Sequence, residues 1–161
     1  MANSYEIKKY STTYNKQVVD LVLDIQNNEA KINLPFEEQI DLQNIENYFI
    51  KSGGMFWIAL KDNNVIGTIG LKKVSKDYAV LKKFFVKKAY RNQQVGLCLY
   101  KELFEFCKIN RFKYIILDTP KVAKQAQKFY LKSGFYFIDK ENLPFEYTYP
   151  DRDSVLMILE I

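Results

Sequence analysis

The chain has 161 residues, of which 48% are hydrophobic and 16% aromatic, and its formal net charge is +5. This size and composition predict one folded domain over residues 1–161 and argue against disorder. The absence of histidine excludes His-based catalytic triads, and two cysteines are too few for a typical structural zinc site. No metal is therefore expected. The scattered lysines indicate a solvated surface, although their field could also attract a polyanionic ligand.

No targeting or membrane signal is expected in this sequence. The N-terminal segment has no apolar run after a basic start, and no stretch approaches the ~18 apolar residues of a membrane span. Cys98 and Cys107 fall in one predicted helix, roughly 13 Å apart, which is too far for a disulfide. We expect a soluble, cytoplasmic protein with no membrane contact. No nucleic-acid partner is expected either, because no nucleic-acid-binding signature is present.

The spacing of apolar residues, near two in strands and near 3.6 in helices, predicts the order of the elements. They are a strand over 5–10, helices over 15–27 and 37–50, strands over 55–60, 65–71 and 78–86, a helix over 94–108, a strand over 114–118, a helix over 122–132, and strands over 135–139 and 154–161. The strand–helix–strand order from 78 to 118 makes its two strands parallel neighbours. The prediction is one α+β domain with a mixed, mostly antiparallel sheet and about four helices.

The stretch from Phe84 to Leu99 is the most informative part of the chain, because it joins a strand end, a short loop and a helix start that contains Gly96. The free N–H groups of a first helical turn and the helix dipole favour a phosphate at that place. Gly96 lets a ligand approach the backbone. The stretch is neither a P-loop nor a Rossmann turn, since both glycine patterns are absent.

At these residues the sequence resembles the GNAT superfamily of N-acetyltransferases, whose pyrophosphate loop has the pattern [QR]-x-x-G-x-[GA]. Residues 91–96, Arg-Asn-Gln-Gln-Val-Gly, match its first and last positions. Gln94 replaces the middle glycine, which matters if its φ is positive. Residues 126–135, with Ala126, Tyr130 and a Gly-Phe pair, are similar to the family's A-x-x-x-Y-x-x-x-G-F. Ala123 stands where the family often has an asparagine that contacts the coenzyme.

The resemblance covers nearly the whole chain, with residues 20–50 matching only in layout. It implies that the parallel strands splay apart and that the pantetheine arm of acetyl-CoA, the cosubstrate, lies in the gap. The implied coenzyme-binding residues are Phe84, Phe85, Val86, Arg91, Asn92, Gln93, Gln94, Val95, Gly96 and Leu97. The implied activity is direct transfer of acetyl to a small-molecule or peptide amine. The resemblance also allows a homodimer.

Tyr130 is the candidate catalytic residue, because a phenol with a pKa near 10 suits the protonation of a thiolate with a pKa near 8–9. Its alternative role is that of a core aromatic. The general base stays open among Glu29, Glu37, Glu38 and Asp118. The glutamates are more simply explained as solvent-exposed charges, and Asp118 could equally cap the next helix.

Aromatic residues offer weaker hints about the acceptor pocket. Tyr147 and Tyr149 lie in a loop that often borders the acceptor in this superfamily, whereas Trp57 more simply packs in the apolar strands. Cys98 is interpreted as packing rather than as a nucleophile. Two rival functions remain at this point: a non-catalytic acyl-CoA-binding module, and, further behind, a basic nucleic-acid-binding protein.

Overall fold

A computed structural model describes residues 4–147 and 153–161. Its seven strands form one sheet in the order β1-β2-β3-β4-β5-β7-β6. The strands are β1 (Glu6–Lys9), β2 (Met55–Lys61), β3 (Asn64–Lys73), β4 (Tyr78–Val86), β5 (Tyr114–Pro120), β6 (Tyr136–Ile138) and β7 (Ser154–Glu160). Every neighbouring pair is antiparallel except β4 and β5, which are parallel. The predicted mixed, mostly antiparallel sheet is confirmed.

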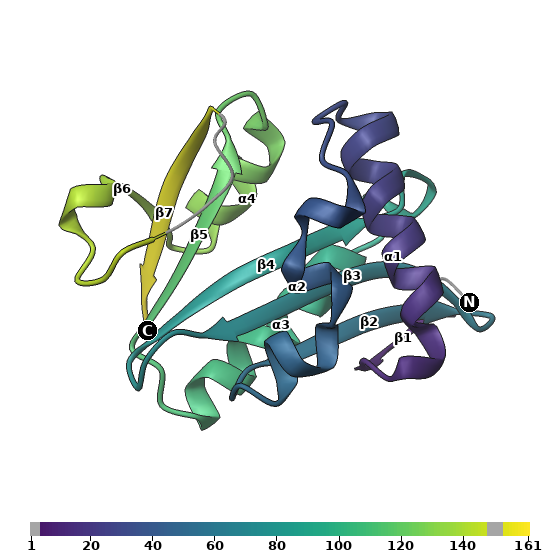
Figure 1. Cartoon of the computed structure of the whole chain (residues 1–161), viewed down its shortest axis with the longest axis horizontal. Coiled ribbons are helices and arrows are strands. Elements are labelled where there is room, and N and C mark those ends of the chain that lie inside the picture. Colours follow the sequence, from purple (N-terminus) through teal and green to yellow (C-terminus); the bar gives the residue numbers. More distant parts are fainter. Residues whose placement is uncertain (1–3, 148–152) are drawn as a thin grey trace.

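Helices cover both faces of this sheet. They are α1 (Asn15–Leu23), α2 (Ile40–Gln43), α3 (Val95–Ile109) and α4 (Lys124–Lys132), with short 3₁₀ or π turns η1 (Thr12–Tyr14), η2 (Asp24–Glu29), η3 (Phe36–Glu38), η4 (Glu46–Ile50), η5 (Lys88–Tyr90) and η6 (Lys140–Asn142). Figure 1 shows α1 and α2 in front of β2–β4 and α3 behind them. Within the described ranges, no helix combines the length and apolar character that crossing a membrane requires.

The core lies on both sides of the sheet. On the α3 face, Leu99 and Leu103 are fully buried against β2 and β3 because they recur one turn apart on a single helix face. On the α1 face, Val22 and Phe49 are equally buried. Trp57 is 2% exposed on β2 and packs its ring against Phe106, which confirms its interpretation as a packing residue.

The predicted continuous helix over 37–50 is wrong. The chain instead forms η3, α2 and η4, because Gln39 and Asn44 leave helical geometry at φ/ψ of −112°/83° and −150°/77°. Gln39 is 4% exposed, and its amide donates to Gln26 Oε1 at 2.8 Å and to Leu34 O at 3.1 Å. Burial of this amide requires those partners, and reaching them breaks the helix. The helix predicted over 15–27 ends as α1 at Leu23 and continues in π geometry.

Candidate active site

β4 and β5 separate shortly after they meet. They pair only over residues 78–80 and 114–116, and Figure 1 shows the two strands diverging from the end at which the C-terminus lies. Beyond that point β4 stays paired with β3, and β5 with β7. Within the described structure, no strand lies between the two facing edges. The predicted splay is confirmed, and its edges present backbone groups to an extended ligand.

The three predicted coenzyme-binding residues of β4 line this gap with their backbone. The side chains of Phe84 and Val86 pack on the α3 face, and that of Phe85 packs on the α1 face. Side chains that alternate in this way leave the main chain of the strand as the surface toward β5. The geometry is compatible with hydrogen bonds to a pantetheine arm and with an N–H that polarises a thioester carbonyl.

The loop from Arg91 to the start of α3 follows β4 directly. Cys98 N donates to Gln94 O at 3.0 Å and is therefore the first donor of the helix. The N–H groups of Val95, Gly96 and Leu97 precede it, so they have no partner within α3. Together with the positive end of the helix dipole, they form an anion-binding site of the kind that a diphosphate needs.

Gln94 has a φ of +66°, so the residue that replaces the family's glycine occupies the left-handed region. That conformation costs a side-chain-bearing residue about 1–2 kcal/mol. Asn92 has the same φ of +66°. The loop therefore keeps the backbone conformation that a glycine would adopt at this position. The replacement by Gln94 affects the stability of the loop and not its backbone conformation.

Gly96 is not required by the packing of the protein itself. A Cβ built on it would lie 3.5 Å from Phe84 Cζ and 3.7 Å from Val86 Cγ2, which are ordinary contacts. The glycine instead keeps the first turn of α3 bare on the side of β4. A ligand that approaches the backbone is the simplest use for that space.

The side chain of Arg91 fastens the loop to the rest of the protein. Its Nε donates to Val86 O at 2.9 Å, and its guanidinium forms a bidentate ion pair with Glu29 at the end of η2, with Nη2 at 2.9 Å from Oε1. The hydrogen bond from Arg91 is the largest of the influences that together hold the pKa of Glu29 below its ordinary value. Glu29 is thereby a poor general base, and Arg91 positions the loop.

Tyr130 lies on α4 beside the gap. It is 7% exposed, and its ring centroid lies 6.3 Å from that of Phe84 and 5.5 Å from that of Phe135. Burial, followed by the charges of Asp118 and Tyr100, raises the pKa of the phenol above its ordinary value. Among the described residues, the Tyr100 hydroxyl is fully buried without a hydrogen-bond partner, whereas the Tyr130 hydroxyl is not in this position. Tyr130 is thus a buried, protonated phenol in the aromatic cluster beside Phe84 of β4, and its interpretation as a core aromatic stays open next to the catalytic one.

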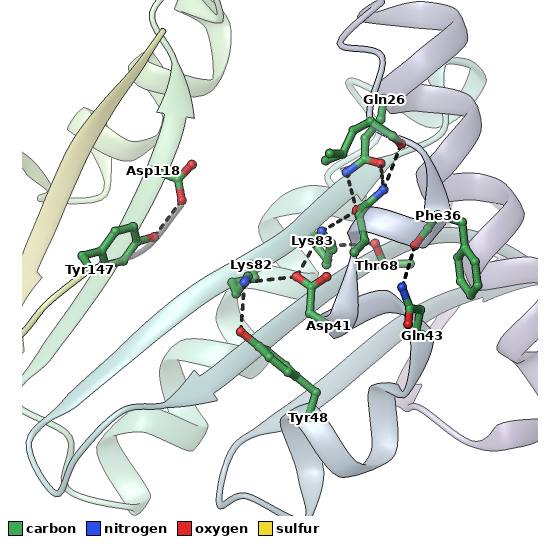
Figure 2. A network of polar contacts seen from close by, with 12 residues as sticks. Gln26, Phe36, Asp41, Gln43, Tyr48, Thr68, Lys82, Lys83, Asp118 and Tyr147 are labelled. Atoms are coloured by element: carbon green, nitrogen blue, oxygen red, sulfur yellow. Dashed lines mark hydrogen bonds and ion pairs between the residues drawn. The ribbon is translucent and has the colours of Figure 1, made fainter. Parts of the chain in front are cut away.

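The other candidates fall at different places. Asp118 lies on β5 past its last pair with β4, and its Oδ1 accepts a hydrogen bond of 2.7 Å from the Tyr147 hydroxyl (Figure 2). Its interpretation as a helix cap is wrong, because the N-cap of α4 is Ala123. Glu37 and Glu38 are exposed, in agreement with their interpretation as solvent-exposed charges. Tyr149 lies outside the described residues.

The sequence did not indicate a role for Lys82 and Lys83. Both form ion pairs with the buried Asp41 on the α1 face of the sheet. The available signal was two adjacent lysines inside an otherwise apolar strand. A strand of period two would place one of them in the core, so the pair indicates a β-bulge.

This seven-stranded sheet, with its splayed parallel pair and a helix start at the mouth of the gap, has the GNAT fold. A model of the Acetyltransferase (GNAT) family matches residues 19–135, and the chain belongs to that family.

Its structure is similar to the crystal structure of an acetyltransferase from Streptococcus agalactiae, at 37% identity and a TM-score of 0.94 over 99% of both chains. It is also similar in fold to the PaiA N-acetyltransferase of Thermoplasma acidophilum in complex with coenzyme A, at 20% identity and a TM-score of 0.78 over 99% of this chain and 100% of that one. N-acetylaspartate synthetase of Xenopus tropicalis is 31% identical over 97 residues, which are 59% of this chain and 36% of that protein. The chain therefore spans about a third of the length of the synthetases that it matches.

Proposed function

We propose that this chain is an N-acetyltransferase that transfers acetyl directly from acetyl-CoA to an amine. The observation that carries the proposal is the gap between β4 and β5, with the bare first turn of α3 at the end of β4. The gap offers backbone edges to an extended thioester, and the helix start offers N–H groups to a diphosphate. The solved relative in complex with coenzyme A supports this choice of cosubstrate.

The residues divide the chemistry between them. An N–H of β4 near Phe85 polarises the thioester carbonyl, the neutral amine attacks its carbon, an N–C bond forms and the C–S bond breaks. The departing thiolate takes the proton of the Tyr130 phenol. The amine nitrogen releases a proton in turn, which returns to Tyr130 through water or a carboxylate. The products are the acetylated amine and the free thiol of coenzyme A.

A thiol-release assay with acetyl-CoA and a panel of amines tests the proposal. We expect acetyl-CoA to raise the melting temperature and thiol to appear only when a suitable amine is present. Stabilisation by acetyl-CoA without thiol release from any amine would leave the non-catalytic acyl-CoA-binding module as the function. No response to acetyl-CoA at all would refute both.

The remaining expectations stay predictions. They are a single domain over 1–161, a cytoplasmic location, no metal, no nucleic-acid partner and no membrane contact. A homodimer also stays open to measurement by light scattering.

A further inference from the structure

A β-bulge places two consecutive lysines on the same face of β4. Thr68 pairs with Phe85 and Gly70 with Lys82, so two residues of β4 oppose the single residue between Thr68 and Gly70. Lys83 takes a φ of +56° at the bulge. Leu81, before the bulge, and Phe84, after it, both pack on the α3 face. The two lysines between them therefore both project to the α1 face.

The two lysines share one carboxylate. Lys82 Nζ and Lys83 Nζ each lie 3.1 Å from Asp41 Oδ2, and the Asp41 side chain is 8% exposed. Lys83 also donates to Gln39 Oε1 at 2.8 Å, and Lys82 donates to the Tyr48 hydroxyl at 3.1 Å. Neither lysine has another ion-pair partner in the described part of the chain. The two lysines and the one carboxylate therefore carry a net charge of +1 close to the gap.

The titration of these groups agrees with that charge count. Burial lowers the pKa of the Lys83 ammonium, and the charge of Asp41 offsets this only in part. For Lys82, burial is the largest single influence and lowers the pKa, but Asp41 and Tyr48 together outweigh it and raise the pKa above its ordinary value. An additional anion near Lys83 would stabilise its charged form.

A carboxylate faces this surplus charge from the other strand. Ile116, two residues before Asp118, packs with Val80 and Tyr147 on the side of the sheet away from α3, and side chains two apart on a strand share a face. The Tyr147 hydroxyl holds Asp118 in place at 2.7 Å. The negative charge of Asp118 is one of the influences on the pKa of Lys83. Figure 2 shows Asp118 and Tyr147 across the gap from Lys82 and Lys83.

We propose that the acceptor is an amine that also carries a carboxylate, that is, an amino acid or a close analogue. Resting on the acetyl transfer proposed above, this assigns the amine to Asp118 and the carboxylate to Lys82 and Lys83. Such a zwitterion completes the charge pairing on both strands, and both contacts are charge-assisted hydrogen bonds. A polyamine would place a second cation against the lysines, and an amine without a carboxylate would bring no anion to them.

The experiment compares matched amines in the thiol-release assay. Each amino acid, including glycine, β-alanine, γ-aminobutyrate, aspartate and glutamate, is paired with its amide or methyl ester, and spermidine is added. We expect kcat/KM to be at least about tenfold higher for the carboxylate member of the preferred pair. Equal turnover of both members, or a preference for spermidine or an uncharged amine, would overturn the assignment and leave the acetyl transfer standing.

Variants locate the effect at the lysines. Lys82→Met should raise KM for the preferred amino acid about tenfold or more and leave KM for acetyl-CoA unchanged, and Lys82→Arg should restore much of the loss. Lys76→Met is the matched control, since it removes the same charge from an exposed turn. The acetyl-CoA-induced rise in melting temperature reports whether each variant is folded. A Lys82→Met enzyme that treats both members of the pair as the wild type does would contradict the proposal. If no amine releases thiol, this inference and the acetyl transfer fall together.

Discussion

Thr68 donates a hydrogen bond of 2.7 Å from its hydroxyl to the carbonyl oxygen of Lys83 and so stabilises the bulge of β4. Thr68 is fully buried, which means that its removal leaves the Lys83 carbonyl without this donor. We expect Thr68→Val to lower the free energy of unfolding by about 1–3 kcal/mol in urea titrations. Thr68→Ser keeps the hydroxyl and serves as the control. Equal stability of the valine and serine variants would show that the bulge does not depend on this bond.

Two glycine-to-alanine changes should separate packing from ligand binding. A Cβ at Gly67 would lie 2.9 Å from Leu99 Cδ1, 3.2 Å from Phe85 O and 3.3 Å from Val95 Cγ1, so Gly67→Ala requires these neighbours on α3 and β4 to shift. We expect it to cost about 1–3 kcal/mol in urea titrations. Gly96→Ala should leave stability unchanged or raise it by up to about 1 kcal/mol, since alanine favours the helix.

Calorimetry measures how Gly96→Ala changes the affinity for acetyl-CoA. Gly96→Ala should weaken acetyl-CoA binding about tenfold or more, because its methyl group occupies the space proposed for the ligand. Wild-type affinity in Gly96→Ala would place the coenzyme elsewhere.

The left-handed conformation of Gln94 predicts that replacing this residue by glycine stabilises the protein. Gln94→Gly relieves about 1–2 kcal/mol of backbone strain, while the unfolded chain gains roughly 0.5–1 kcal/mol of entropy. We expect a net increase in the free energy of unfolding of about 0–1.5 kcal/mol, with acetyl-CoA affinity maintained or improved. A clear loss of stability would mean that the glutamine side chain contributes a contact that outweighs the strain.

Asp41 should make stability depend on pH. Burial alone raises the pKa of this carboxyl, but the charges and hydrogen bonds of Lys83 and Lys82 together outweigh burial and hold the pKa below its ordinary value. A lowered pKa in the folded state contributes stability above the unfolded value near 3.9, and this contribution disappears as the pH falls through the folded pKa.

Asp41→Asn tests that dependence, because it leaves two lysine ammonium groups without their shared counter-ion. We expect a loss of about 3–5 kcal/mol at pH 7. The difference from the wild type should narrow as the pH is lowered below about 3.9. Unfolding free energies of both proteins from pH 7 to pH 3 provide the comparison, and a difference that stays constant over this range would contradict the prediction.

Tyr130→Phe tests the proposed proton donor. The variant removes one hydroxyl from an aromatic cluster, so acetyl-CoA affinity should hold while kcat falls about 10²-fold or more. Because burial raises the pKa of the phenol, the wild type should retain its acid at alkaline pH up to at least about 10. Unchanged turnover in the variant would exclude Tyr130 from the mechanism.

The strands and the long helices α3 and α4 could be predicted from the sequence because their apolar residues are periodic and local turn chemistry separates them. Between β2 and β3, Asp62 and Asn63 have φ of +51° and +64°, as a type I′ turn requires. The helix over 37–50 failed because a buried amide, Gln39, bonds to residues that are distant in the sequence. Local periodicity contains no information on such partners.

The candidate site divides in the same way. The loop at 91–97 and Tyr130 followed from a motif whose residues are close in sequence. The acceptor face could not be predicted, since it depends on the bulge at Lys83 and on the approach of Asp41 from a segment some forty residues earlier. Tyr147 and Asp118 are likewise distant in the sequence and come together only in the fold, where Tyr147 packs with Val80 and Ile116.

A crystal structure with acetyl-CoA tests the account most directly. We predict that the diphosphate lies against the N–H groups of residues 92–97 and that the thioester lies between β4 and β5 with its sulfur near the Tyr130 hydroxyl. Density for the coenzyme at another surface, with the gap between the strands closed, would contradict the account.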